Sequence, residues 1–398
     1  MRNRALAALK IILLLLTCLF TTACETLNIQ AIGKEQKFTL ADDEKRLWKR
    51  SDEFAEIVNN SGFVSSDVEL QVYLTGLVNN ILPSEVKAAG SNVKVYVLND
   101  PSFNAFMLPT GVMYIHTGLL VGLENEAQLV TVLGHELDHF ISRHSLKFYR
   151  NLKNTSAFYA TLSATAIAAP YASLAGLLVQ YSFLSSVTGY SKEMEAEADR
   201  MGFDAIIKNN YDMQQGVRAF EVMEKQVKEE KIKEPYFFST HPKIKERIRN
   251  FKELSASFKD KTTYLGKETK EDLYNAKIKG IILENAFLDI KKVHFKSAER
   301  AIERFLKLEP EGPEGYYMQG ELFRYRGEKG DTDKALESYR RSVEKDNNYA
   351  LAHKAMGLIY YKMKKSDLAK KEFQDYLLLF PQAQDKEYIV KYLDELNS

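Results

Sequence analysis

Residues 129–140 read LVTVLGHELDHF, an apolar run that carries two histidines four positions apart and a glutamate directly after the first. Residues four apart on an α-helix lie on the same face, so His135 and His139 can direct two imidazole nitrogens at one metal ion. Glu136 lies beside them, within reach of a water molecule on that metal. A buried histidine pair in a core helix is the alternative, but a buried carboxylate without a partner is costly.

A catalytic zinc site of this H-E-x-x-H type needs a third protein ligand and one open position. Residues 190–200 read YSKEMEAEADR, where Glu195 and Asp199 are again four apart. We expect Glu195 to join the two histidines around one Zn²⁺ per chain. Asp199 would accept a hydrogen bond from the outer nitrogen of a ligand histidine and so fix its tautomer. Taken alone, this acidic helix is also explained by a solvated face with ordinary charge pairs.

These motifs, followed by STHPKIKERI at residues 239–248, resemble one family of gluzincin zinc metallopeptidases. The family pattern is H-E-x-x-H, then E-x-x-A-D, then serine or threonine with His-Pro and an arginine. Its members include the heat-shock protease HtpX, the CAAX prenyl proteases, the mitochondrial Oma proteases and periplasmic forms such as BepA and LoiP. The resemblance covers about residues 40–255 and implies a zincin-type domain that hydrolyses peptide bonds.

The resemblance implies a role for each matching residue. It makes His135, His139 and Glu195 the zinc ligands. It makes Asp199 the aspartate that supports a ligand. Glu136 would be the catalytic base and then the proton donor to the departing amine. His241 would lie near the site, as a fourth ligand in a resting state or a donor to the oxyanion, with a structural turn as the alternative. Asp138 replaces the usual small or apolar residue without removing a ligand, and His144 is expected to support the helix rather than bind metal.

A short β-sheet is expected before the metal helix. Residues 93–97 alternate valine with other residues, which predicts a strand, and residues 41–82 look helical. NAFMLPTGVMYIHTGLL, at residues 104–120, has a Pro-Thr-Gly turn before a second strand. The resemblance makes this segment the edge strand beside the site. A substrate strand is then expected to pair with its main chain around Met113–His116.

The C-terminal part repeats itself with a period of 34 residues. One position of the repeat is occupied by Ala301, Ala335 and Ala369. A second position is occupied by Phe305, Tyr339 and Phe373. A small residue, an aromatic and a closing proline at this period resemble the tetratricopeptide repeat, a helix–turn–helix unit. A non-repeating helical tail is the alternative. The Lys-rich stretch 255–272 is predicted to be a linker.

The N-terminus has the layout of a secretory signal peptide, in which a basic start precedes the apolar run 11–20. An uncleaved anchor is the alternative. Cys24 follows Thr-Thr-Ala, which resembles the lipobox of bacterial lipoproteins, although Thr21 replaces the usual leucine. A lipidated Cys24 would tether the chain to the outer membrane on its periplasmic side, and a free thiol is the alternative.

The predicted fold is mainly α with a small β-sheet. Its predicted parts are a signal peptide at 1–24, a zinc metallopeptidase domain at 25–262 and a repeat domain at 270–398.

Charge and composition narrow the functions further. The net charge is +1, so a nucleic-acid partner is not expected. The stretch 155–187 carries no charged residue and is predicted to form a buried hairpin or a surface against a membrane, with a membrane span as the alternative. The expected function is a zinc-dependent endopeptidase of the bacterial envelope. It would act on misfolded or misassembled proteins, with repeats that dock substrates or outer-membrane assembly machinery. The alternatives are a repeat-based chaperone with a latent protease site and an integral membrane protease.

Overall fold

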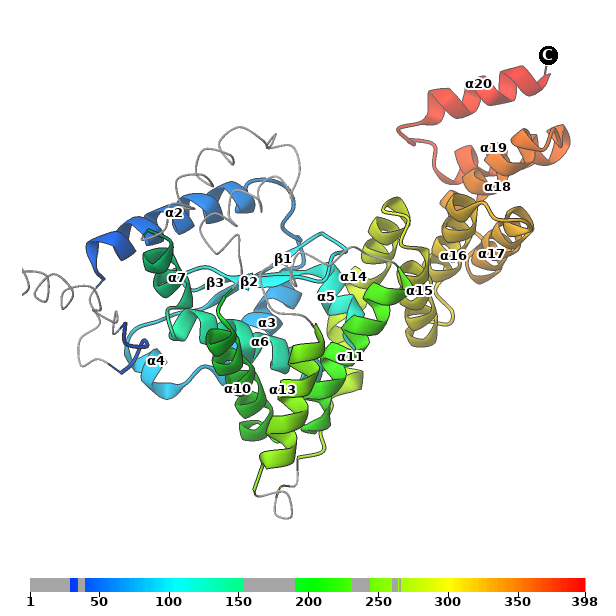
Figure 1. The fold of residues 1–398 in the computed structure, drawn as a ribbon. Helices are drawn as coiled ribbons and strands as arrows, with labels where there is room; N and C mark the ends of the chain where they lie inside the picture. The colour runs from blue at the N-terminus through cyan, green and yellow to red at the C-terminus, as the bar shows by residue number, and fades with distance from the viewer. Residues whose placement is uncertain are drawn as a thin grey trace, which may run out of the picture.

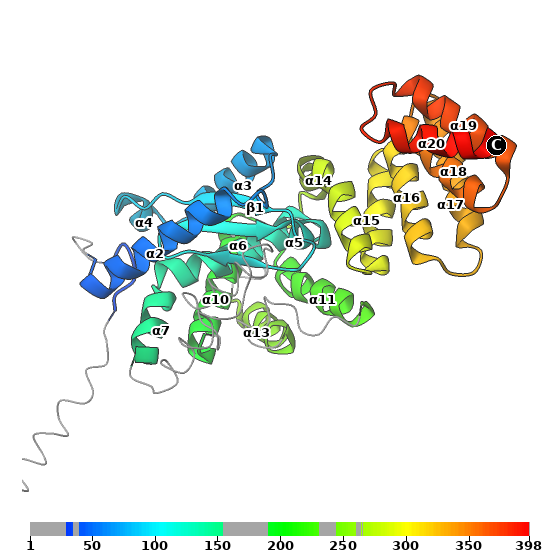
Figure 2. The ribbon, with the colours of Figure 1, turned by 90° about the horizontal axis from the view of Figure 1, so that it is seen from above.

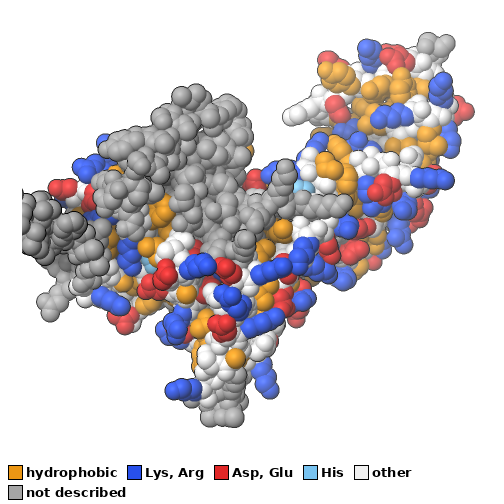
Figure 3. Space-filling view, in the orientation of Figure 1, with side chains coloured by type: hydrophobic (Ala, Val, Ile, Leu, Met, Phe, Trp, Pro, Cys, Tyr) orange, Lys and Arg blue, Asp and Glu red, His pale blue; other side chains and the backbone are white. Residues whose placement is uncertain are grey.

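The computed structural model shows a mainly helical protein with one small sheet, which confirms the predicted fold class (Figure 1). It describes residues 29–34, 40–153, 190–230, 244–259, 264 and 266–397. Cys24, the stretch 155–187 and His241 lie outside this description. Within it, none of the helices combines the length and the apolarity needed to cross a membrane. Acidic and basic side chains are interspersed over the described surface in Figure 3.

The sheet contains three strands in the order β1-β3-β2. They are β1 (Lys94–Leu98), β2 (Ala105–Met107) and β3 (Val112–His116). β3 is parallel to β1 and antiparallel to β2, so both of its edges are hydrogen-bonded within the sheet. The expectation that a substrate strand pairs with Met113–His116 is therefore wrong. In the described sheet the outer strands are β1 and β2.

The two faces of the sheet are covered by different helices, because successive strand residues point in opposite directions. On one face, Tyr114 packs with Phe54 and Val58 of α2 (Asp42–Asn59), and its hydroxyl donates to Asn59 Oδ1 at 3.0 Å. On the other face, Met113 joins the main core together with α3 (Val68–Ile81). The helical stretch predicted at 41–82 is therefore two helices on opposite faces of the sheet.

The metal helix lies between the sheet and a second layer of helices (Figure 1). This helix is α6 (Glu126–Ile141), and every one of its residues is buried, which explains why the run reads as apolar on all sides. The other helices in the described residues of this part are α4 (Ser84–Ala88), α5 (Thr117–Gly122), α7 (His144–Lys153), α10 (Lys192–Lys208), α11 (Gln214–Glu229) and α13 (Ile244–Ser257).

The C-terminal helices form antiparallel pairs that extend away from the sheet, as Figure 2 shows. They are α14 (Glu271–Lys291), α15 (Phe295–Leu308), α16 (Pro313–Arg326), α17 (Asp331–Lys345), α18 (Ala350–Lys362), α19 (Ser366–Leu379) and α20 (Lys386–Asn397). A Cβ on Gly320 would lie 2.3 Å from the Tyr339 ring, and one on Gly357 would lie 2.6 Å from Phe373. The periodic aromatic residue therefore fills a space that only a glycine on the facing helix leaves open.

The first repeat helices share one hydrophobic core with the N-terminal part of the chain. Tyr274 and Ile278 of α14 are fully buried in the core that contains the sheet and α6. The predicted linker is also bonded to this part, because Asp212 N donates to Glu268 O at 3.0 Å. The repeats therefore begin as an extension of the N-terminal core, without a free connection at residues 268–270.

Two side chains of the first repeat hold the N-terminal end of α6. Arg304 of α15 donates to the carbonyl oxygens of Val121, in the last turn of α5, at 3.0 Å and of Leu123, in the loop before α6, at 2.8 Å. Lys270 forms an ion pair of 3.0 Å with Glu126, the first residue of α6 and 2% exposed. The two Arg304 hydrogen bonds satisfy carbonyl groups that α5 leaves unbonded at its end.

We expect Arg304→Ala to lower the free energy of unfolding by about 2 kcal/mol, because several charge-assisted hydrogen bonds to partly buried carbonyls are lost. The control is Arg341→Ala, which removes an exposed arginine of α17 and should change stability by less than about 0.5 kcal/mol. Urea unfolding followed by circular dichroism measures both. Equal effects of the two substitutions would show that the Arg304 contacts do not stabilise the fold.

Candidate metal centre

The site depends on a close crossing of α6 and α10. A Cβ on Gly134 would lie 2.9 Å from Gly202 Cα, and a Cβ on Gly202 would lie 2.6 Å from Thr131 O. Two glycines therefore let the helix backbones touch, which no larger residue allows. Ser191 caps the start of α10 by accepting a hydrogen bond from Met194 N at 3.3 Å. The crossing and the cap together place the first turn of α10 beside the histidines of α6.

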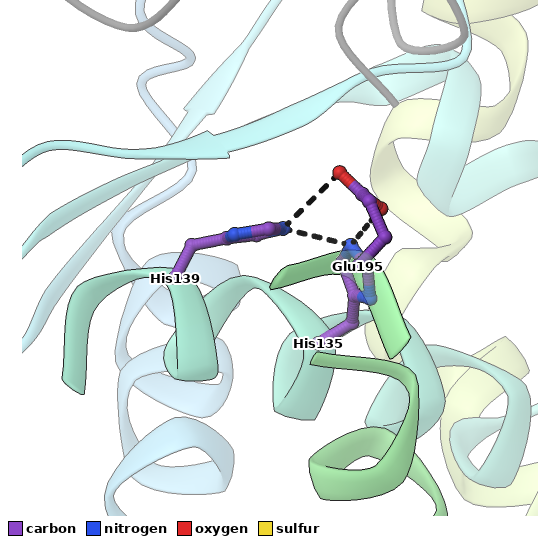
Figure 4. Close-up of side chains that lie close together, drawn as sticks. All are labelled: His135, His139 and Glu195. Carbon is purple, nitrogen blue, oxygen red and sulfur yellow. Dashed lines mark hydrogen bonds and ion pairs between the residues drawn. The ribbon is translucent and has the colours of Figure 1, made fainter. Parts of the chain in front are cut away.

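Three side chains from the two helices direct donor atoms at one point, as Figure 4 shows. Nε2 of His135 lies 3.0 Å from Nε2 of His139. Glu195 places Oε2 3.5 Å from His135 Nε2 and Oε1 3.8 Å from His139 Nε2. Their side chains are 0%, 3% and 1% exposed. The structure thus brings together the three residues that the sequence proposed as ligands.

The arrangement fits a zinc ion on two grounds. Tetrahedral zinc with bonds of about 2.05 Å separates its ligand atoms by roughly 3.3 Å, and the three observed separations of 3.0, 3.5 and 3.8 Å bracket this value. The formal charges also fit. Among the described residues, Glu136, Glu195 and Asp199 are buried, and the buried guanidinium of Arg247 pairs with Asp199, which leaves two negative charges for a divalent cation to balance.

Glu136 is 2% exposed and follows His135 on the same buried helix. Burial raises the pKa of the Tyr190 hydroxyl, and the carboxylates of Glu136 and Glu195 raise it further. The Tyr190 ring stacks on the His139 ring, with centroids 4.0 Å apart and planes 16° apart. The stacking fixes the plane in which His139 presents its nitrogens.

The outer nitrogen of His135 meets a group of hydrogen-bonding side chains. Asp199 Oδ1 lies 3.2 Å from His135 Nδ1, and Arg247 Nε lies 2.5 Å from the same oxygen. Asn250 donates to Asp199 Oδ2 at 2.9 Å. Arg247 Nη2 also lies 2.9 Å from His135 Nδ1, but a guanidinium can only donate and so cannot accept a proton from this nitrogen. With Nε2 turned toward a metal, Nδ1 must carry the proton, so Asp199 is the group that can accept from it.

The outer nitrogen of His139 meets a different partner, a second imidazole. His139 Nδ1 lies 2.9 Å from Nδ1 of His144, which is fully buried. Burial lowers the pKa of His144, and Lys147 lowers it further, so this imidazole is favoured in its neutral form. Burial also raises the pKa of Asp138 to about 7, with Glu197 adding to the shift.

Comparison with known proteins identifies the region that holds these residues. Residues 70–255 match peptidase family M48, and residues 327–364 match a TPR repeat. The M48 peptidases depend on zinc, in agreement with the donor set found here. The matched TPR segment spans α17 and α18.

The chain is similar to several curated proteins over part of its length. It is 30% identical over 219 residues to the mitochondrial metalloendopeptidase OMA1 of Schizosaccharomyces pombe. This alignment covers 53% of this chain and 61% of the relative. It is 23% identical over 221 residues to the beta-barrel assembly-enhancing protease of Escherichia coli, covering 54% and 44%. A Vibrio cholerae protein to which the same name is assigned provisionally is 25% identical over 245 residues, covering 59% and 49%. The chain spans about half the length of the curated relatives it matches.

Several side chains in the region that matches M48 contribute to the site without having been assigned a role from sequence. Arg247 follows the His-Pro motif, and the family pattern includes this arginine, but only the fold shows that it holds Asp199. Asn250 lies one helical turn further on α13. Tyr190 directly precedes the helix cap at Ser191. A lone tyrosine or asparagine carries no signal in one sequence, so the packing of α10 against α13 was needed to find them.

We expect Gly202→Ala to lower the free energy of unfolding by about 2 kcal/mol and to weaken zinc binding, because the added methyl group forces α6 and α10 apart. The control is Gly76→Ala on α3, where a Cβ would meet no atom within 4 Å. That substitution should be neutral or stabilising by up to about 1 kcal/mol. Urea unfolding and metal content after dialysis measure both effects. A stable, fully zinc-loaded Gly202→Ala variant would contradict the role of the crossing.

Proposed function

We propose that this chain is a zinc-dependent endopeptidase of the bacterial cell envelope that hydrolyses peptide bonds of misfolded or misassembled proteins. The observation that supports it most directly is the convergence of His135, His139 and Glu195 on one point beside the buried Glu136. The M48 match and the protease names of the relatives support the same activity. His135, His139 and Glu195 are the proposed ligands, and Asp199 is proposed to orient His135.

A zinc ion held there would lower the pKa of a water molecule and polarise the carbonyl group of a peptide bond. Glu136 is proposed to accept the proton of the attacking water and to deliver it to the departing amine. Asp199, held by Arg247, keeps the proton of His135 on Nδ1 and so keeps Nε2 available. His241 remains a proposed fourth ligand or oxyanion donor, on the strength of the His-Pro motif alone.

The substrate is proposed to add as a strand to β2. Asn104 and Leu108 are bonded to β3, through His116 N to Asn104 O at 3.0 Å and Leu108 N to Val112 O at 2.7 Å. Because hydrogen bonding alternates along a strand, the main-chain groups of Ala105 point away from β3. β2 also packs on α6, and Met107 lines a small cavity together with His139. A strand added here would run past the metal site, held by main-chain bonds.

The other parts of the proposal concern docking and location. The repeats, α14 to α19, are proposed to bind unfolded substrates or outer-membrane assembly machinery, since stacked helical pairs form extended binding surfaces. The basic and apolar N-terminus supports export to the periplasm, and a lipidated Cys24 would tether the protein to the outer membrane. The comparison with beta-barrel assembly-enhancing proteases supports the envelope location.

Glu136→Gln is expected to lower the rate of casein cleavage by about 10²-fold or more, because the general base is lost while the zinc ligands remain. Zinc content should stay at one ion per chain. His139→Ala and Glu195→Ala are expected to lose both zinc and activity. The control is Glu56→Gln on the exposed side of α2, which should leave both unchanged.

The same variant separates the two functions proposed from sequence. If Glu136→Gln abolishes proteolysis but still supports assembly of outer-membrane proteins in cells, the repeat-based chaperone is the better description. If proteolysis continues at the normal rate, Glu136 is not the base and the proposed enzyme mechanism is wrong.

Strand addition at β2 predicts a two-residue period in substrate binding. In a set of peptides N-methylated at successive positions around the scissile bond, cleavage should be impaired at alternate positions, because only every second amide faces the edge strand. Cleavage rates from chromatography measure this. A uniform effect at all positions would argue against pairing with β2.

A further inference from the structure

The link between α6 and α7 contains Arg143, whose backbone is strained. The turn that it makes directs the next side chain, that of His144, toward the metal site. α6 ends at Ile141, and Arg143 adopts a φ of 54°, in the left-handed region that non-glycine residues rarely occupy. Its guanidinium is held by Glu44, at 2.9 Å from Nε, and by Gln30 O, at 3.1 Å. Such strain persists only where surrounding contacts fix it, and it is often found beside functional sites.

The consequence of this turn is that His144 starts a new helix and meets His139 from outside the α6 ladder. Its Nδ1 lies 2.9 Å from Nδ1 of His139. Its Nε2 lies 3.3 Å from Oε2 of Glu197, which comes from α10. Ser142 Oγ lies 3.3 Å from the second oxygen of Glu197, and so helps to place that carboxylate. The three residues form a continuous chain, His139–His144–Glu197, from the metal site to a half-exposed carboxylate.

The proton positions in this chain are determined by metal binding. If Nε2 of His139 binds a metal, its Nδ1 carries the proton and must donate. His144 Nδ1 must then accept, so the proton of a neutral His144 sits on Nε2, where Glu197 can accept it. With the opposite tautomer, His144 Nδ1 would donate to His139 Nδ1. His139 would then carry its own proton on Nε2 and could not bind the metal.

Two carboxylates compete for the proton of His144. Glu197 Oε2 lies 3.3 Å from Nε2 and favours the tautomer that allows metal binding. Asp138 Oδ2 lies 3.9 Å from Nδ1, beyond hydrogen-bond distance, and would favour the opposite one. The geometry therefore favours the proton on Nε2.

We propose that His144 and Glu197 are positioning residues for the zinc site: Glu197 fixes the tautomer of His144, and His144 in turn holds His139 with Nε2 free for the metal. This inference rests on the proposed function, because it takes His139 as a zinc ligand. The two ligand histidines would then be oriented in different ways. His135 is held directly by a carboxylate, whereas His139 is held through an intervening imidazole.

The test compares two substitutions of similar size. His144→Leu removes the acceptor and should weaken zinc binding by about 10- to 100-fold. His144→Asn keeps a carbonyl oxygen near the position of Nδ1 and should retain most of the affinity. Glu197→Ala should cause a smaller loss in the same direction, whereas Glu197→Gln, which can still accept from Nε2, should remain near wild type. Zinc affinity is measured by competition with a chromophoric chelator, and the unfolding midpoint is measured in the metal-free protein.

The outcomes separate positioning from general structural support. Loss of zinc affinity in His144→Leu with recovery in His144→Asn supports the proposal. Equal losses in both, in step with lower metal-free unfolding midpoints, would overturn it, as would full affinity in His144→Leu. Nitrogen NMR of the histidines in the zinc-loaded wild type gives an independent answer without any variant. A His144 protonated on Nε2 supports the proposal, and one protonated on Nδ1 overturns it.

Two further variants serve as controls. His353→Leu removes a buried histidine of the repeats that pairs with Glu372 at 2.7 Å, and it should leave zinc affinity unchanged. His139→Ala tests the function on which the inference rests. If His139→Ala keeps full zinc affinity, the proposed ligand set fails. If it loses zinc while His144→Leu does not, only the positioning role fails.

Discussion

The contact of α6 with α10 at Gly134 and Gly202 is the constraint on which the site depends. The two histidines are local to one helix, but Glu195 comes from a helix that starts 51 positions after α6 ends, as the bounds of 141 and 192 show. A carboxylate side chain is short, so its oxygens reach the imidazole nitrogens only where the two backbones touch. A Cβ on Gly202 would lie 2.6 Å from Thr131 O, so a larger residue at this position would push the two helices apart.

The buried side chains of the site carry more negative than positive charge. The carboxylates of Glu136, Glu195 and Asp199 are buried, and among the described residues of the neighbouring helices Arg247 is a fully buried cation. Isolated buried charges are strongly unfavourable, so a divalent ion bound at the proposed site would offset the remaining negative charge of these described residues. Stability and metal binding are therefore linked. The close crossing is favourable when a cation joins the two helices, and it leaves repelling groups together when none does.

The sequence was most informative where function constrains spacing. The four-residue spacings in HELDH and EAEAD predicted which side chains share one face of each of the two helices. The 34-residue period predicted the helix pairs of the repeats. It was least informative about pairing between segments. β3 looked like an edge strand because strand order depends on long-range contacts that no local pattern records. The same limit applies to Arg247, whose role emerges only when α13 packs against α10. The predicted linker was Lys-rich, yet Glu268 is bonded to the core through its main chain, which composition does not report.

The metal helix is held at both ends by parts of the chain that are distant in sequence. At its start, Lys270 pairs with Glu126, and Arg304 bonds the preceding loop, so the first repeat fixes where α6 begins. At its end, the left-handed Arg143 is tied to Glu44 of α2. His135 and His139 lie between these two anchors. A shift of α14 or α15 would therefore act on α6 directly, through hydrogen bonds and a shared core. This makes the first repeat a structural part of the metal centre, whatever its outer surface binds.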